Sequence, residues 1–284
     1  MRTFELFPDL EIVVTEAKEA NMSISWGPRE VVLPRREKFF DAFGWEKEKA
    51  ILLHLHAAEY EVREAMPEHA NLLDPDKHFE FQGAMTNDPT LILTLLVADC
   101  APVAFYDPFR QAHAVIHSGF RETDHDMPGK AVRAMAKTYV SPPENLEVWI
   151  GPAIRSCCYR FTRMPEKLDP QCLNYFHHSP AGSEIAPVGM LRDRLVRAGV
   201  RQQNIMDAQI CPSGPSTFFS HFRDSRAGVH EVRFLVAVRQ HPQVREPPTA
   251  TTAQAPAPDR LSVAPPARIG PLRSTPEPRP TPVT

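Results

Sequence analysis

The sequence lacks the segments that would direct it to a membrane or a secretory route. No apolar run approaches the roughly 20 residues needed to cross a bilayer. The N-terminus, MRTFELFPDLEIVVTE, does not have the basic-then-apolar plan of a signal peptide. The five cysteines are an odd number without short-spaced pairs such as CxxC, so a disulfide framework is not indicated. We therefore expect a soluble protein of the reducing cytoplasm with no membrane partner.

Strong charge of either sign is also missing. The formal net charge is −3 and the pI is near 6.5, and the basic residues are scattered rather than clustered. A polyanion needs a basic patch, so nucleic acid is not an expected partner.

Several enzyme signatures are absent from the chain. It has no HExxH, no Gly-rich phosphate loop and no GxSxG, and His78-Phe79-Glu80 is not followed by the PCxxC of cytidine-type deaminases. These absences exclude the common zinc peptidases, P-loop enzymes and α/β-hydrolases. With 284 residues and 42% hydrophobic content, the chain can still bury one large core.

The apolar patterns predict a mixed order of strands and helices, which indicates an α+β domain rather than regular βαβ units. The expected strands are 10–15, 22–26, 50–55, 91–97, 103–106, 112–116, 146–150, 205–211 and 233–238, and 91–97 is expected to pair with 103–106. The expected helices are 35–43, 129–139, 166–176 and 190–198.

The composition changes near residue 240. Twelve of the 30 prolines follow that point, and aromatic residues vanish. Such a segment cannot form a packed core, so we expect one folded domain at 1–240 and a disordered Pro-rich tail at 241–284.

The stretch from Leu95 to Arg121 concentrates reactive side chains at predicted strand ends. Cys100 follows one strand and His117 ends another, and thiolate and imidazole are ligand types that zinc or copper prefers. Because side chains alternate along a strand, the third ligand can come from the pair His54 and His56, or from His113 on the face that His117 uses. The spacing alone leaves several triads open, as well as the reading that a buried cysteine simply packs.

Three segments resemble a known family. VADCAPV, VIHSGFR and GPAIRSCCY are similar to the ADCLPV, AVHAGWRG and GPAIGPCCYEV blocks of the laccase-domain family, also called multicopper polyphenol oxidase. Members of that family have been reassigned as zinc-dependent purine nucleoside phosphorylases. Weaker collinear matches are Asn21-Met22-Ser23 to its NLS, His54-Leu55-His56-Ala57 to its QVHG, and FFSHFRD at 218–224 to its FFSYRRD. The resemblance covers roughly residues 20 to 240.

The resemblance implies a layered fold with helices packed outside β-sheets, and it selects one ligand set. It implies that His56, Cys100 and His117 hold a zinc ion, with copper also possible. It makes Arg121 and Asp99, the residue beside the metal cysteine, catalytic candidates. It makes Arg223 and Asn21 candidates for substrate binding. The implied substrates are a purine nucleoside and phosphate, for phosphorolysis of adenosine or inosine or for adenosine deamination.

This chain departs from the family pattern beside the expected pocket. Gln82 stands where many members have an aspartate, Glu122 replaces the glycine after Arg121, and Phe120 replaces a tryptophan. These changes crowd the pocket rim and favour, as a competing hypothesis, a member of the family that keeps a ligand but has weakened turnover.

The residues also support two hypotheses of a different chemical class. Cys100 activated by His117 and oriented by Asp99 describes a thiol hydrolase. A copper phenol oxidase is less favoured, because it needs more histidines and a weak axial ligand. The adjacent pair Cys157-Cys158 is interpreted as packed structural thiols, too strained to form a disulfide with each other readily.

Overall fold

The computed structural model of the protein describes residues 1–7, 9–55, 60–161, 170–179, 182–228 and 232–241. The chain divides into two units, 1–243 and 244–284. The tail predicted for 241–284 therefore lies, apart from His241, outside the described residues.

The described residues form an α+β fold with the following elements. The strands are β1 Arg2–Phe7, β2 Leu10–Val14, β3 Ala50–Leu52, β4 Val62–Glu64, β5 Gly83–Thr86, β6 Ile92–Val97, β7 Ala101–Asp107, β8 Ala112–Ser118, β9 Glu147–Ile150, β10 Arg160–Phe161, β11 Phe176–Ser179, β12 Gly182–Ile185, β13 Ile205–Asp207 and β14 Phe234–Gln240. The α-helices are α1 Arg29–Ala42, α2 Phe120–Asp124, α3 Met127–Tyr139, α4 Pro187–Arg197 and α5 His221–Asp224.

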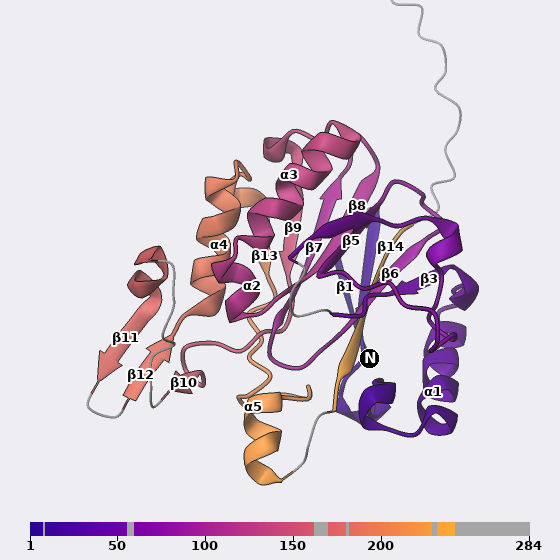
Figure 1. Ribbon diagram of the computed structural model, residues 1–284, viewed down its shortest axis with the longest axis horizontal. Helices are drawn as coiled ribbons and strands as arrows, with labels where there is room; N and C mark the ends of the chain where they lie inside the picture. Colours follow the sequence, from indigo (N-terminus) through magenta and orange to yellow (C-terminus); the bar gives the residue numbers. More distant parts are fainter. Residues whose placement is uncertain (8, 56–59, 162–169, 180–181, 229–231, 242–284) are drawn as a thin grey trace, which may run out of the picture. The chain divides into compact units, whose positions relative to one another are not determined.

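Two large sheets carry the domain (Figure 1). One has the order β1-β2-β14-β6-β3 and the other the order β13-β9-β7-β8-β5-β4, while β10, β12 and β11 form a small separate sheet. Most neighbours are antiparallel, whereas β3 with β6, β4 with β5 and β9 with β13 run parallel.

Side-chain alternation explains why the two sheets stack. Leu93 and Leu95 of β6 point into a core shared with Val115 of β8, whereas Ile92 of β6 points to the opposite face. In the same way Ala114 and Ile116 of β8 point away from that shared core, toward the helices. A strand buried on both faces reads as a continuous apolar run, which is the pattern seen in the sequence.

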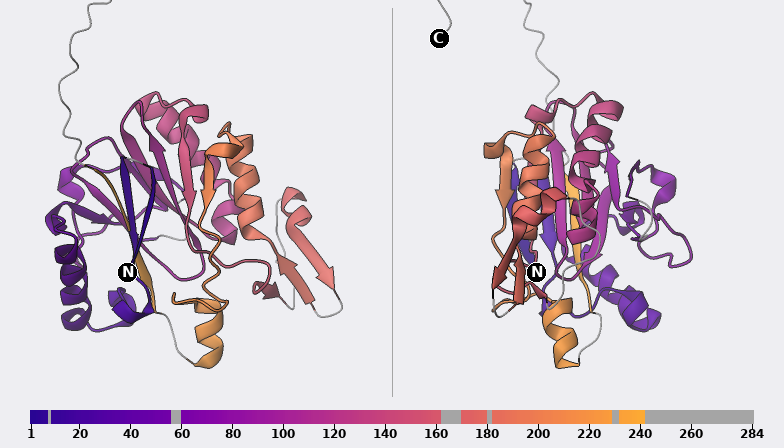
Figure 2. Two further views of the ribbon diagram at one scale, coloured as in Figure 1. Left: turned by 180° about the vertical axis from the view of Figure 1, so that it is seen from behind. Right: turned by 60° about the vertical axis from the view of Figure 1, so that its left-hand side comes forward.

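Helices cover the outer face of each sheet. On the six-stranded sheet, Val132 and Met135 of α3 and Leu191 and Leu195 of α4 pack into one apolar cluster. On the five-stranded sheet, Phe39 and Phe40 of α1 pack into another. The ribbon views show α3 and α4 together over one sheet and α1 beside β3 (Figures 1 and 2). The predicted class, with layered sheets and helices outside them, is confirmed.

Among the described residues, no helix is both long and apolar enough to cross a membrane. The helix expected at 166–176 is described only from residue 170, as the 3-10 helix Pro170–Tyr175 that precedes β11. Two local predictions were wrong. The segment 22–26 ends in a 3-10 helix, Ile24–Trp26, instead of a strand. The strands 91–97 and 103–106 do not pair, because β6 and β7 belong to different sheets.

Candidate active site

Cys100 and His117 lie side by side at one end of the strand pair β7 and β8. Cys100 directly precedes β7, and the register pairs Ala101 with Ser118 and Pro102 with His117. Gly119 faces Cys100 closely, since a Cβ built on Gly119 would lie only 2.8 Å from Cys100 Sγ. The thiol therefore depends on a residue without a side chain at position 119.

Gln82 orients the His117 imidazole. Gln82 Oε1 lies 2.9 Å from His117 Nδ1, and the His117 backbone N–H donates to the Gln82 carbonyl at 2.8 Å. An amide oxygen only accepts, so Nδ1 carries the proton and Nε2 holds the free lone pair. Burial lowers the pKa of His117, with Glu122 opposing, so the ring is neutral near pH 7. A neutral ring whose second nitrogen is held by a hydrogen bond is the usual state of a histidine that binds metal.

Cys100 sits among groups that together oppose its ionisation. Burial raises the pKa of its thiol to about 12, with the Glu122 and Asp99 carboxylates adding to the rise and Arg233 opposing it. A bound metal ion supplies the charge that ionises such a thiol. The donor types present, a thiol and a tautomer-fixed imidazole, fit zinc.

Glu122 enters this group from α2. Its Oε2 atom lies 3.9 Å from His117 Nδ1, and a Cβ on Gly119 would touch it at 2.6 Å. The side chains of His117 and Glu122 are 12% and 13% exposed, so the carboxylate points inward and not to solvent. Sequence comparison marked Glu122 only as a departure, and its place beside the thiol and the imidazole was not predicted.

Asp99 lies behind Cys100 and joins it to α5. Its backbone has a positive φ of 84°, and its Oδ2 accepts hydrogen bonds from Ser220 Oγ at 3.0 Å and Phe222 N at 2.6 Å. Burial raises the pKa of Asp99, and these two hydrogen bonds oppose the rise. In this position the carboxylate fixes the turn that presents Cys100.

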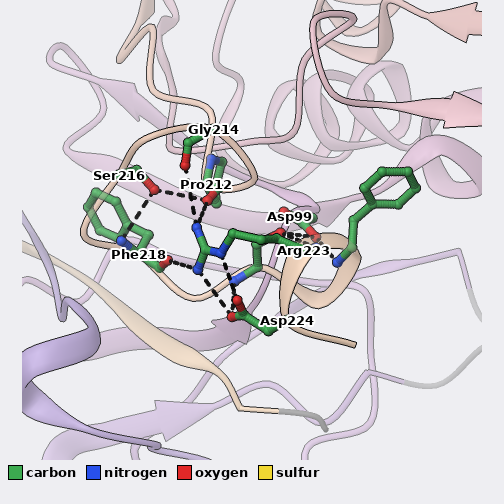
Figure 3. A network of polar contacts seen from close by, with 9 residues as sticks. Asp99, Pro212, Gly214, Ser216, Phe218, Arg223 and Asp224 are labelled. Carbon is green, nitrogen blue, oxygen red and sulfur yellow. Dashed lines mark hydrogen bonds and ion pairs between the residues drawn. The ribbon is translucent and has the colours of Figure 1, made fainter. Parts of the chain in front are cut away.

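Arg223 is held by its own loop (Figure 3). Its guanidinium donates to the carbonyls of Pro212, Gly214 and Phe218 and to the carboxylate of Asp224. These contacts fix the segment 212–224 around the end of α5. The guanidinium N–H groups of Arg223, which were expected to bind substrate, are therefore directed to protein atoms.

Asn21 is used in a similar way. The residue is 8% exposed, and its side chain forms hydrogen bonds with Ser23 while its Oδ1 accepts from the Arg233 N–H at 3.0 Å. The amide connects the segment before α1 to the start of β14.

Arg121 has the opposite character. It is exposed on α2, and within the described part of the chain no hydrogen bond or ion pair holds its guanidinium. It lies close enough to Tyr60 and Tyr159 to lower the pKa of both phenols against the rise that burial causes. A surface ion pair with Glu122 is not formed, so this cation remains available for an anion.

Two cavities adjoin these residues. One, of about 110 Å³, is lined largely by apolar side chains from several elements: Ala98, Asp99, Cys100, Ala101, Ser118, Gly119, Phe120, Ala153, Ile154, Tyr159, Pro187, Val188, Leu191, His221 and Phe222. The other, of about 320 Å³, is lined by His54 and Leu55 together with Trp26, Arg36 and Arg233. The aromatic side chains that line the first cavity, Phe120 and Phe222, suit a flat apolar group.

The third expected ligand, His56, lies outside the described residues. The chain leads toward it through His54, which is partly buried and stacks on His78 with ring centroids 4.6 Å apart. His113 does not join the site, because it is fully buried and its Nδ1 lies 3.0 Å from Gln240 Nε2. Of the triads left open by alternation, the structure brings together Cys100 and His117.

The adjacent cysteines are not packed in the core. Cys157 is exposed and Cys158 partly exposed, so their interpretation as packed thiols was wrong. Cys211, which no sequence spacing connected with them, lies in the same cluster.

The fold and this geometry define a layered α+β protein with a thiol and imidazole pair at a strand end. The chain belongs to the family described as multi-copper polyphenol oxidoreductase laccase, whose model matches residues 14–235. It is 31% identical over 207 residues to purine nucleoside phosphorylase LACC1 of Mus musculus, covering 69% of this chain and 45% of that protein.

Two further similarities extend this result. A purine nucleoside phosphorylase of Xylella fastidiosa (strain 9a5c) is 30% identical over 152 residues, which is 51% of this chain and 57% of the relative. The chain thus spans about half the length of these curated relatives. A crystal structure of the Bacillus licheniformis hypothetical protein YfiH superposes with a TM-score of 0.73 at 22% identity, covering 84% of this chain and 99% of that one, and it supports the fold.

Proposed function

We propose that this protein is a zinc-dependent phosphorylase of purine nucleosides, with His56, Cys100 and His117 as the metal ligands. The observation that carries the proposal is the pair Cys100 and His117 at neighbouring strand ends. Gln82 fixes the tautomer that leaves the Nε2 lone pair of His117 free, and the surroundings of Cys100 keep its thiol protonated without metal. The names of the relatives, all purine nucleoside phosphorylases, supply the substrate class.

In the proposed reaction a phosphate oxygen bonds to the ribose C1′ atom while the C1′–N bond to the purine breaks. The base leaves with the bonding electron pair and takes up a proton. Bound zinc would supply positive charge to orient the phosphate and to stabilise developing negative charge. Three protein ligands with one open position is the arrangement of a catalytic zinc site.

The side chains around the metal position have separable tasks. Arg121 holds the phosphate, because its planar donor fork is exposed and unpaired within the described chain. Gln82 keeps the His117 ring in its ligand orientation. Phe120 and Phe222 give the neighbouring cavity the apolar walls that take a purine ring and exclude water. Adenosine deamination at the same site requires water where phosphate is proposed.

The thiol-hydrolase hypothesis is less well supported. A nucleophilic cysteine needs a lowered pKa, whereas burial, Glu122 and Asp99 raise the pKa of Cys100 to about 12. The Nε2 lone pair of His117 is free in either role, so the imidazole does not distinguish them. The raised pKa of the thiol favours a metal ligand over a free nucleophile.

One observation favours a second candidate, a ligand-binding member with weakened turnover. The Glu122 carboxylate, which replaces the family's glycine, lies near Cys100 and on the Nδ1 side of His117, where it crowds the space in which the substrates are proposed to bind. Replacing Glu122 by Gly, the family residue, should then raise turnover without adding metal, whereas equal or lower turnover favours an active role for the carboxylate.

The decisive experiment measures zinc content and products from adenosine and inosine, with and without phosphate. Cys100→Ala should lose both zinc and phosphorolysis, while Cys172→Ala, which removes a buried thiol elsewhere, should keep both. Arg121→Lys should raise the KM for phosphate at unchanged zinc content. The proposal would be refuted if wild-type protein without zinc still converts inosine. If that zinc-free activity is then lost in Cys100→Ala, the thiol nucleophile is favoured.

A further inference from the structure

A second sulfur cluster lies outside the groups used so far. The Sγ atoms of Cys157, Cys158 and Cys211 all lie within 4.8 Å of one another, and those of Cys157 and Cys158 are 3.5 Å apart. The three are free thiols, one exposed and two partly exposed. Cysteine is usually a buried apolar residue, so three thiols gathered near solvent are not explained by packing.

The scaffold brings these thiols together from two distant segments. β9 and β13 are parallel neighbours, with Ile150 opposite Asp207, so the chain leaves both strands at the same edge of the sheet. Cys157 and Cys158 follow β9, and Cys211 follows β13. Because the strands are fixed in the sheet, the two segments that carry the cysteines start from fixed positions.

Several contacts hold the segments in register without any metal. Arg155 forms a two-point ion pair with Asp207 at the end of β13, with Nη1 3.1 Å from Oδ2. The Ala153 N–H donates to the Ile210 carbonyl at 3.0 Å, and the Cys158 N–H donates to the Arg155 carbonyl at 2.9 Å. The cluster is thus prearranged by hydrogen bonds on both sides.

The spacing of the sulfur atoms fits one shared ion. Metal–sulfur bonds of about 2.3 Å place two sulfurs on one ion about 3.7 to 4.0 Å apart. The separation of 3.5 Å between Cys157 and Cys158 lies just below this range, and no pair of the three sulfurs is more than 4.8 Å apart. Within the described residues no imidazole, carboxylate or fourth thiol joins the cluster. Structural zinc takes four protein ligands, whereas soft thiolates select Cu(I).

We propose that Cys157, Cys158 and Cys211 form a three-thiolate site for one Cu(I) ion, separate from the zinc site of the proposed function. Binding forms three Cu–S bonds and releases the S–H protons to solvent. No oxidation or reduction takes place when the ion arrives as Cu(I).

The test uses the full chain, reduced, freed of metal and kept without oxygen. Cu(I) is titrated against a chromogenic chelator, and Zn(II) is titrated alone in parallel. A Cys100→Ala background removes the thiol ligand of the zinc site, so that the two sites are read separately. In that background we expect one Cu(I) per chain, tighter than Zn(II).

Adding Cys157→Ser should weaken Cu(I) binding more than about 100-fold, since one of three ligands is lost. Cys157 is exposed, so this variant tests the site without disturbing the core. Cys211→Ser should give the same loss, and Cys172→Ala should give none. In the chain with Cys100 intact, Cys157→Ser should retain phosphorolysis, which separates failure of this site from failure of the proposed function.

Three results would overturn the proposal. The first is Cu(I) affinity unchanged by Cys157→Ser and by Cys211→Ser. The second is tighter stoichiometric binding of Zn(II) than of Cu(I). The third is a disulfide between Cys158 and Cys211, found by mass spectrometry of protein alkylated without reduction, which would make the cluster a redox pair.

Discussion

Replacing Gly119 by Ala tests how closely the active site is packed. The backbone at Gly119 has φ −77° and ψ −172°, which an alanine adopts without strain, so the effect is purely one of space. The added methyl group would lie 2.8 Å from Cys100 Sγ and 2.6 Å from Glu122 Oε2. The Glu122 side chain is long enough to swing away, but Cys100 can relieve the contact only by turning its sulfur out of position.

The size of the effect follows from that contact. Forcing a methyl group into a packed site costs about 1–3 kcal/mol of folding free energy. In a domain of this size that lowers the thermal midpoint by roughly 2–4 °C for each kcal/mol. A catalytic group displaced by about 1 Å loses on the order of 100-fold in rate. We therefore expect a folded protein with a modestly lower midpoint, depleted zinc and kcat/KM for inosine reduced about 100-fold.

Gly189→Ala is the matched control. Gly189 lies in α4, and the nearest atom to an added Cβ is 3.7 Å away, so this alanine fits. Alanine is favoured over glycine in a helix by roughly 0.5–1 kcal/mol, so its midpoint should stay level or rise. If Gly119→Ala and Gly189→Ala have equal zinc content and equal kcat/KM, then the Cys100 sulfur is not held against Gly119 in the way proposed.

Three further predictions follow from the described contacts. Gln82→Leu removes the acceptor of His117 Nδ1–H and should weaken zinc binding about 10- to 100-fold in a chelator competition, and equal affinity would exclude the orienting role. Burial lowers the pKa of His113 to about 3, so the unfolded chain binds a proton that the native chain excludes. The contribution of His113 to the free energy of unfolding should thus be complete above pH ~6.5, and this free energy should fall by up to about 1.4 kcal/mol per pH unit toward pH ~3. Urea unfolding across this pH range should show a shallower fall for His113→Gln, and parallel curves for the two proteins would contradict the prediction. Ending the chain after Gln240, where β14 ends, should leave the thermal midpoint within about 5 °C of the full chain, and a larger drop would mean that the removed residues contribute to the fold.

The strands that build the core were predictable because they are buried on both faces. β6, β8 and β14 appear in the sequence as apolar runs, and their positions agree with the predicted strands to within a few residues. Where a predicted strand was wrong, local hydrogen bonds had favoured another backbone conformation. At 22–26 the Asn21 side chain bonds to Ser23, and the Trp26 N–H donates to the Ser23 carbonyl, which closes a 3-10 turn instead of extending a strand.

The order of strands in a sheet is a tertiary property that a local pattern does not contain. Asp99, with its positive φ, sits in the turn through which the chain passes from β6 in one sheet to β7 in the other. For the same reason the partner of Cys157 and Cys158 was not predictable. Cys211 reaches them only because β13 pairs in parallel with β9 after a long crossover that includes α4.

The position of β14 has a consequence for how the chain is made. This strand, the last one along the described residues, lies between β2 and β6, so it joins the first part of the domain to the middle. During synthesis from the N-terminus, β2 and β6 each leave an unpaired edge until residues 234–240 emerge. Contacts of such long sequence separation form slowly, and open strand edges invite pairing with other chains. Completion of the five-stranded sheet, and with it protection from aggregation, must therefore wait until nearly the whole folded unit has been translated.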